Sequence, residues 1–362
     1  MPPRNLLLLA IVVVLEMSTA LSFFASAQTQ NRIPAIAPPA GLTIAVLDGM
    51  KNLPGGLTAL PSPPIAPGNP QTQAKIDLGR MLFLDKGLSN DHSISCASCH
   101  DPTKAYSDGL ATGVGINHNR LKRRTPSLLN SAYNPAQFWD GRAKSLEEQV
   151  LVPILAKGEM GMPVSETLLA RLQQVPKYRR GFREAFKREV NLIDVQRSIA
   201  AFERTLVTPD SAFDRYAAGD KQALTDPQKR GLILFIGKAA CSQCHSGPNF
   251  TDNKFHSLGF LPGQKEDPDV GRFAISKSPT DRGAFKTPSL RSVRLQSHFM
   301  HNGSFASLAE VIAFYDNGGG AGPKSNLLFK LHLTDAEKVD LLAFLNALAS
   351  QVSEDFHSNN MK

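Results

Sequence analysis

Cysteine and tryptophan are scarce in this sequence, and long hydrophobic runs are absent beyond its first residues. The 362 residues include four cysteines and one tryptophan. After residue 27 no stretch is long and apolar enough to span a bilayer, which argues against a transmembrane protein. Strand signals are also weak, because the apolar residues follow helical spacing between loops rich in glycine and proline. We therefore expect a mainly α fold.

The first 27 residues have the pattern of a secretory signal peptide. One arginine precedes the ten-residue apolar core LLLLAIVVVL (6–15), and Ala25-Ser26-Ala27 is a cleavage motif. The alternative, a membrane anchor, needs a longer apolar run, and Glu16 interrupts this one. We predict cleavage near Ala27 and a soluble protein exported to the periplasm.

The chain is basic, with a formal charge of +8 and a pI near 9.3. Such a charge can indicate nucleic acid as a partner, but export disfavours that interpretation. An acidic partner protein or an anionic surface fits better, and a basic surface that serves only solubility stays open as the alternative.

All four cysteines lie in two C-x-x-C-H motifs, Cys96-Ala-Ser-Cys99-His100 and Cys241-Ser-Gln-Cys244-His245. This spacing is the attachment signature of c-type haem, because two thiols reach the two vinyl groups and the adjacent His binds the iron. One zinc site built from four cysteines, or two disulfide or redox pairs, are the alternatives. Neither explains why a His follows each second Cys, so we predict two covalently bound haem c groups.

A duplication accompanies the two motifs. Residues 125–148 and 287–310 align without a gap and share eight identities, and Trp139 in the first copy corresponds to His301 in the second. Helix caps of the form Ser-x-x-Glu open a helix in both copies, Thr225 and Gln228 form a similar cap, and TDAEKVDLLAFLNALA (334–349) reads as a capped amphipathic helix.

The duplication predicts two cytochrome c-like haem modules in tandem, with long loops. We expect a Pro-rich extended linker over 28–70, with folded sequence from near Gln71. The N-terminal module then covers 71–212, the C-terminal module 213–350, and a tail 351–362.

Several segments together resemble the bacterial di-haem cytochrome c peroxidases and the related methylamine-utilisation protein MauG. They include LGRMLFLDKGLSNDHSISCASCHDP (78–102), RTPSLLNSAYNPAQFWDGR (124–142), CSQCHSGPNFTDNKFHSLGF (241–260) and FMHNGSFASLAEVIAFYDNGG (299–319). The resemblance spans about Leu78 to Leu348, most of the chain. It implies an exported enzyme that reduces hydrogen peroxide at the N-terminal haem with electrons passed through the C-terminal haem.

The resemblance assigns roles to individual residues. His100 and His245 match the proximal iron ligands, and Trp139 matches an electron relay between the haems. Gln149 and Glu159, ten and twenty residues beyond Trp139, match the peroxide-orienting amide and the acid–base group. Without the resemblance, Trp139 reads as a core aromatic residue and the other two as surface residues.

At the C-terminal haem the sequence departs from the peroxidases of this family. Where they carry a Met ligand to the iron, this chain has Tyr315, which is the MauG pattern. Tyr315 is thus the candidate axial ligand, although it could simply end a helix. Met300 is a weaker alternative, and His298 and His301 lie nearby.

At the N-terminal haem the family's removable distal His corresponds to Ile116, and His118, two residues away, is a weak candidate for an axial ligand. We favour an open iron that reacts with peroxide without prior reduction. The family's calcium ion is possible but doubtful here, because its Asn ligand corresponds to Arg124 and its Thr-x-Pro to Gln296-Ser-His298.

Two versions of the enzyme remain open at this point. In one, electrons arrive from a small cytochrome or cupredoxin. In the other, which Tyr315 favours, a protein substrate is oxidised through Trp139. The alternative from another class is a non-catalytic di-haem electron carrier. A homodimer is also possible.

Overall fold

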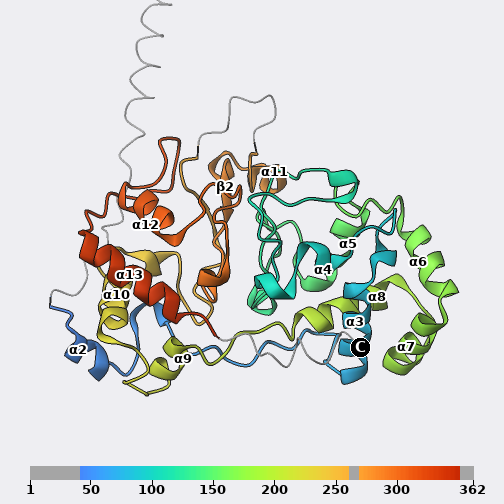
Figure 1. Ribbon diagram of the computed structural model, residues 1–362, viewed down its shortest axis with the longest axis horizontal. Helices are drawn as coiled ribbons and strands as arrows, with labels where there is room; N and C mark the ends of the chain where they lie inside the picture. The colour runs from blue at the N-terminus through green and yellow to red at the C-terminus, as the bar shows by residue number, and fades with distance from the viewer. Residues whose placement is uncertain (1–40, 261–268, 351–362) are drawn as a thin grey trace, which may run out of the picture. The chain divides into compact units, whose positions relative to one another are not determined.

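The computed structural model describes residues 41–260 and 269–350, and it confirms a mainly helical fold (Figure 1). Within these residues the one sheet pairs β1 (Phe255–Ser257) antiparallel with β2 (Ala284–Lys286). None of the described helices is long and apolar enough to cross a membrane. The predicted signal peptide and C-terminal tail lie outside the described residues.

The helices fall into two groups, each around its own hydrophobic core. The first group consists of α3 (Gln73–Leu84), α4 (Cys96–Cys99), α5 (Leu146–Leu155), α6 (Ser165–Gln174), α7 (Pro176–Phe186) and α8 (Leu192–Glu203). The second consists of α2 (Ile44–Gly49), α9 (Ala212–Ala217), α10 (Asp226–Ile236), α12 (Leu308–Asp316) and α13 (Asp335–Ala347). The short helix α11 (Phe273–Ser276) has no buried residue and belongs to neither core. Short 3-10 helices of three residues each lie between these helices along the chain.

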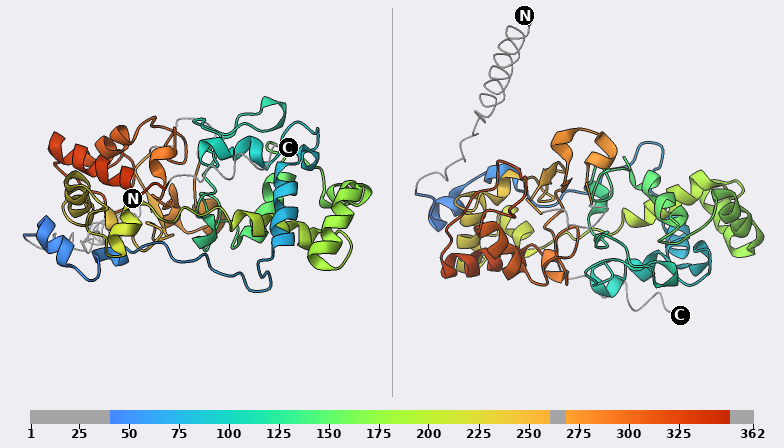
Figure 2. Two further views of the ribbon diagram at one scale, coloured as in Figure 1. Left: turned by 60° about the horizontal axis from the view of Figure 1, so that its bottom comes forward. Right: turned by 90° about the horizontal axis from the view of Figure 1, so that it is seen from above.

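The same crossing of two helices is the centre of each module. In the first, α3 packs on α8, and in the second α10 packs on α13 (Figure 1; Figure 2). A Cβ at Gly79 would lie 1.9 Å from the Ser198 carbonyl oxygen, and one at Gly231 would lie 2.0 Å from that of Asp340. Glycine is therefore what permits these close crossings, since any side chain would push the helices apart.

Aromatic packing repeats in the same register. Phe83 meets Phe202 edge to face with ring centroids 5.1 Å apart, and Phe235 meets Phe344 with the same separation. The cores of the two modules are thus built in the same way, as the duplicated sequence predicts.

The segment expected to be an extended linker is partly structured. Leu47 in α2 and Leu57 are fully buried in the core of the C-terminal module. The Thr43 side chain caps α2, and the Asp48 carboxylate lies 2.7 Å from the Lys229 ammonium. The prediction that folded sequence begins near Gln71 is therefore wrong. The many prolines of this segment favour an extended chain, but a short capped helix forms because its apolar residues pack into the core of the C-terminal module.

The duplicated segments join the modules by reciprocal hydrogen bonds. The Arg124 N–H donates to the His301 carbonyl oxygen over 2.7 Å, and the Lys286 N–H donates to that of Trp139 over 2.8 Å. Arg124 corresponds to Lys286 in the duplication, and Trp139 to His301. The same two positions of the duplicated segment are therefore hydrogen-bonded in both directions, from the first copy to the second and from the second to the first.

Candidate active site

The first C-x-x-C-H motif is a single helical turn with an oriented His after it. Ser95 and Ser98 form a capping box that starts α4, so both thiols lie on one short turn. Nδ1 of His100 lies 3.0 Å from the Tyr106 carbonyl oxygen. Burial lowers the pKa of His100, which favours the neutral ring. With Nδ1–H donating to the carbonyl, Nε2 is the nitrogen left to bind a metal.

The second motif repeats this geometry. Cys241 begins a 3-10 turn, and Nδ1 of His245 lies 3.0 Å from the Phe250 carbonyl oxygen. Burial also lowers the pKa of His245. Both rings are thus oriented by a backbone carbonyl, an arrangement typical of imidazole ligands to iron or zinc.

Both motifs open onto one cavity of about 770 Å³. All four cysteines are free, and in the described part of the chain they do not gather into a four-thiol cluster. Burial raises the pKa of Cys99 to about 11 and that of Cys241 to about 12. Two separated thiol pairs, each with an oriented His on a largely apolar cavity, fit two covalently attached haems and not a zinc-thiolate site.

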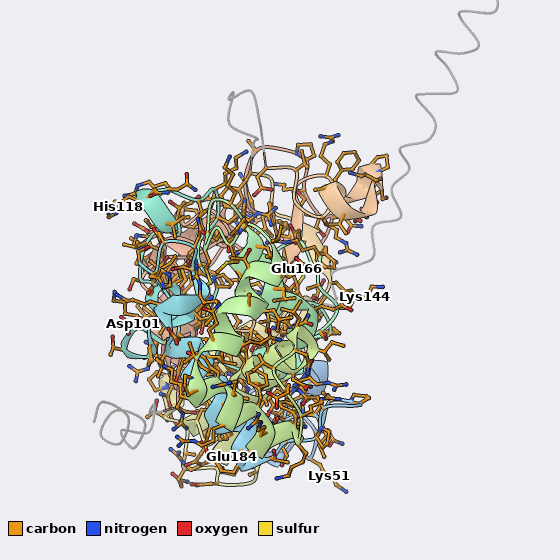
Figure 3. All side chains as sticks on the ribbon, turned by 90° about the vertical axis from the view of Figure 1, so that its right-hand side faces the viewer. Lys51, Asp101, His118, Lys144, Glu166 and Glu184 are labelled. Carbon is orange, nitrogen blue, oxygen red and sulfur yellow. The ribbon has the colours of Figure 1, made fainter. Side chains whose placement is uncertain are left out.

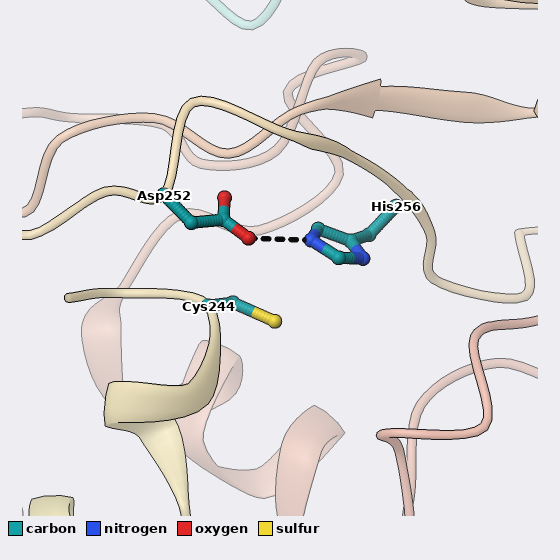
Figure 4. A group of neighbouring side chains, drawn as sticks. All are labelled: Cys244, Asp252 and His256. Carbon is teal, nitrogen blue, oxygen red and sulfur yellow. Dashed lines mark hydrogen bonds and ion pairs between the residues drawn. The ribbon is translucent and has the colours of Figure 1, made fainter. Parts of the chain in front are cut away.

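One candidate metal cluster does occur in the described chain, at the wall of the second haem site (Figure 4). It consists of Cys244, Asp252 and His256, and Nε2 of His256 lies 2.9 Å from Oδ2 of Asp252. The hydrogen bond to Asp252, with Cys244 adding to it, raises the pKa of His256 to about 10. Because Cys244 belongs to the attachment motif, we interpret the other two as a charged pair beside the haem. This pair is not predicted from the sequence.

The two predicted peroxide-handling residues line the cavity together with His100. Gln149 projects from α5, and Glu159 follows that helix in a turn whose backbone accepts the Ile116 N–H over 2.8 Å. Burial raises the pKa of Glu159, and nearby Arg142 partly opposes this. A carboxyl group with a raised pKa can accept and return a proton near neutral pH.

His118 is not brought to the cavity. It is exposed, and Asn117 and His118 both have left-handed φ angles, +55° and +56°, which turn the loop outward (Figure 3). Ile116 is buried instead and packs near the Glu159 turn. The geometry therefore disfavours His118 as a ligand to the first iron, which stays a prediction. Ile116, which corresponds in sequence to the family's distal His, is apolar and does not line the cavity either.

Trp139 is buried at the junction of the modules. Its Nε1–H donates to the Arg124 carbonyl oxygen over 2.9 Å, and its ring lies edge to face with His301 at 6.5 Å. Aromatic contacts continue from His301 to Phe260 at 5.6 Å and from Phe260 to Phe314 at 5.1 Å. Phe314 is next to Tyr315, with ring centroids 5.4 Å apart. A continuous row of rings thus connects Trp139 to the second haem site.

Tyr315 lies near the end of α12 and lines the cavity beside the second motif. Burial raises its pKa, and the neighbouring thiols of Cys241 and Cys244 add to the effect. Met300 lines the same cavity, whereas His298 does not. His301 is stacked on Phe285 at 3.6 Å, and burial lowers its pKa to about 4. Tyr315 and Met300 thus both stay candidates by position, with Tyr315 beside the attachment thiols.

The Arg124 guanidinium is buried among oxygen atoms of the C-terminal module. Nε donates to the Met300 carbonyl oxygen over 3.1 Å, and one terminal nitrogen donates to Oε1 of Gln296 over 3.2 Å. Gln296 belongs to the segment that the resemblance assigns to calcium, and Met300 lies two residues beyond it. A cation of the protein itself already uses them, so calcium stays a prediction that this geometry disfavours.

A tandem helical fold with two oriented C-x-x-C-H motifs on one cavity defines a di-haem c-type protein. The model of the family described as di-haem cytochrome c peroxidase matches residues 73–222. The methylamine utilization protein MauG of Methylorubrum extorquens is 43% identical over 293 residues, which cover 80% of this chain and 82% of that protein. The cytochrome-c peroxidase IdrP1 of a Pseudomonas species is 39% identical, with 93% and 91% covered.

A solved structure supports the same assignment. The crystal structure of a MauG-like protein associated with microbial copper homeostasis matches with a TM-score of 0.74 and 33% identity, over 81% of this chain and 94% of that one. The chain therefore belongs to the di-haem cytochrome c peroxidase family, and it is an oxidoreductase that acts on peroxide. Nothing in these comparisons favours the alternative of a non-catalytic electron carrier.

Proposed function

We propose that hydrogen peroxide is reduced at the N-terminal haem, attached through Cys96 and Cys99, and that electrons pass through the C-terminal haem at Cys241 and Cys244. The observation that carries this proposal is that Gln149 and Glu159 both line the cavity that His100 lines. The haem supplies the iron at which the peroxide bond breaks. Glu159 moves a proton from the inner to the outer peroxide oxygen, and the Gln149 amide orients the peroxide.

Within the family, we propose the MauG-like version of the chemistry. Tyr315 lines the second haem site beside both attachment thiols, and a phenolate ligand stabilises oxidised iron. At the first site the residue that corresponds to the family's distal His is Ile116, which has no atom that can ligate iron, so a haem held there would be left open to peroxide. The substrate is then an electron-donor protein or a protein oxidised through Trp139. An acidic partner surface is the expected complement to a chain of charge +8.

We further propose that the protein is exported and acts in the periplasm. The signal-peptide pattern that ends near Ala27 supports this, and so does the attachment of haem c outside the bacterial cytoplasm.

The test of the proposed function is a peroxide reaction without reductant. Ferric protein with both haems attached, mixed with one equivalent of peroxide in a stopped-flow spectrometer, is expected to react at once. The matched variant Ile116→His restores a potential iron ligand and is expected to react only after prior reduction. A wild-type protein that needs prior reduction would contradict the open-site proposal.

Trp139→Phe tests the relay. We expect peroxide to bind the N-terminal haem as in the wild type, while electron transfer between the haems, followed by flash photolysis or stopped-flow, becomes at least tenfold slower. The change also removes the hydrogen bond from Nε1 to Arg124, which costs on the order of 1 kcal/mol. A thermal unfolding curve therefore serves as the control. Unchanged transfer between the haems would remove Trp139 from the path.

A further inference from the structure

The N-terminal module contains a buried carboxylic acid to which the proposed chemistry gives no role. Glu203 is the last residue of α8, its side chain is 3% exposed, and it lines the cavity near the first motif. Its Oε2 is buried without a hydrogen-bond partner in the described part of the chain. Burying an unpaired carboxyl group costs free energy, so packing alone gives no reason for an acid here.

The duplication shows that the fold does not need an acid at this position. The contact of Gly79 with Ser198 matches that of Gly231 with Asp340, which sets the register between α8 and α13. In this register Glu203 corresponds to Leu345, which is 7% exposed and lines the same cavity. The C-terminal module thus builds the same helix crossing with an apolar side chain.

The groups around Glu203 place its pKa where the carboxyl group can gain or lose a proton near neutral pH. Burial raises its pKa to about 8, while the adjacent Arg204 lowers it and Glu147 of α5 raises it further. Arg204 and Glu147 lie 2.7 Å apart and largely neutralise each other. From α4, the Cys96 thiol is close enough for Glu203 to raise its pKa, and from α3, Arg80 lies over the neighbouring Phe202 ring at 5.8 Å. Glu203 is thus the side chain in this group whose charge can change near neutral pH.

We propose that Glu203 exchanges a proton with solvent whenever the N-terminal haem changes its oxidation state. When that haem gives an electron to peroxide, or to an electrode, the O–H bond of the Glu203 carboxyl group breaks and the proton leaves to solvent. The carboxylate then offsets the added positive charge, an effect that is large in a low-dielectric site. When the electron returns, a proton returns to Glu203. The inference rests on the proposed haem attachment at Cys96 and Cys99.

The sign of the coupling follows from the charge. Oxidation adds positive charge near Glu203, which favours the carboxylate, so the pKa of Glu203 is lower beside the oxidised haem than beside the reduced one. Between these two pKa values, reduction takes up a proton. The midpoint potential of the N-terminal haem therefore falls as the pH rises through this window, and it is flat on either side.

The experiment is a redox titration of the protein with both haems attached, at a series of pH values, for the wild type, Glu203→Gln and Glu203→Leu. The wild-type potential of the N-terminal haem is expected to fall with pH at up to one proton per electron, and both variants are expected to be flat. Reduced-minus-oxidised infrared spectra should show a protonated carboxyl band that both variants lack. Glu184→Gln, which removes a 65% exposed carboxylate on α7, is the matched control and should behave as the wild type.

A pH slope or a carboxyl band that persists in Glu203→Gln would overturn the inference. Leucine is the residue that the C-terminal module carries at this position, and glutamine has nearly the same shape as glutamate, so one of the two variants should fold even if the other does not. The titration is also independent of where peroxide reacts. If peroxide reacted at the C-terminal haem, the proposed function would fail in the turnover assays, while the proton coupling at Glu203 would still be measured.

Discussion

Replacement of His100 by glycine is expected to abolish peroxide turnover while the haem stays attached through Cys96 and Cys99. Nε2 of His100 is the ligand available beneath the first iron, because Nδ1 is engaged by the Tyr106 carbonyl oxygen at 3.0 Å. Removing the imidazole removes the ligand that fixes the iron and tunes its reactivity. The measurement is steady-state peroxide consumption per attached haem, with haem content checked by mass spectrometry.

The duplicated module supplies the matched control. His245→Gly makes the same change in the C-terminal module, where Nδ1 contacts the Phe250 carbonyl oxygen at the same distance, 3.0 Å. This variant should still react with one equivalent of peroxide at the N-terminal haem but lose sustained turnover. Wild-type rates in His100→Gly would show that the N-terminal haem is not the reactive one.

Glu159→Gln is expected to lower kcat for peroxide by about 10²- to 10⁴-fold, the usual contribution of general acid–base catalysis. Glutamine keeps the shape of the side chain but cannot carry the proton between the two peroxide oxygens. The loss should appear with little change in peroxide binding to the ferric protein. Activity within threefold of the wild type would exclude Glu159 as the acid–base group.

The pH profile provides a second test of Glu159. The ionised carboxylate accepts the first proton, and burial raises the pKa of Glu159 above its ordinary value. The acid limb of kcat/KM should therefore lie at higher pH than for an exposed glutamate, and activity should fall as the pH drops through this raised pKa. In Glu159→Gln this limb should be absent. Gln149→Ala is the control, since it should weaken turnover without moving the limb.

Local sequence signals predicted much of this fold. The capping boxes at Thr225, Ser307 and Thr334 open α10, α12 and α13, and the Ser145 side chain caps α5. Such caps involve residues three apart in the sequence, so the pattern and the contact are local. The two C-x-x-C-H motifs are local in the same sense, because one turn of chain sets the spacing of the thiols and the His.

Long-range features were harder to predict. Helix α2 lies in a proline-rich stretch, and only its packing against the second core shows that Leu47 is buried. Glu203 reads as an ordinary polar position at a helix end, and its burial depends on where α8 crosses α3. An alignment of the duplicated helices would have revealed it, since the equivalent residue is Leu345.

The contact between Trp139 and His301 is another long-range feature that the sequence does not predict. These residues correspond in the duplicated sequence, but that correspondence does not say that they touch. Their rings meet because the reciprocal hydrogen bonds of Arg124 and Lys286 join the two copies around a common junction. The duplication is visible in the sequence, whereas the hydrogen bonds that join its two copies are visible only in the structure.

The central claim is that peroxide reacts at the N-terminal haem while the C-terminal haem passes electrons. A low-temperature EPR spectrum of the ferric protein tests this claim most directly. If, as proposed, Ile116 leaves the first iron open and Tyr315 is a ligand to the second, the protein as isolated should give one high-spin and one low-spin signal. Two low-spin signals would contradict the account, because they would mean that a side chain of the protein occupies the position where peroxide is proposed to bind.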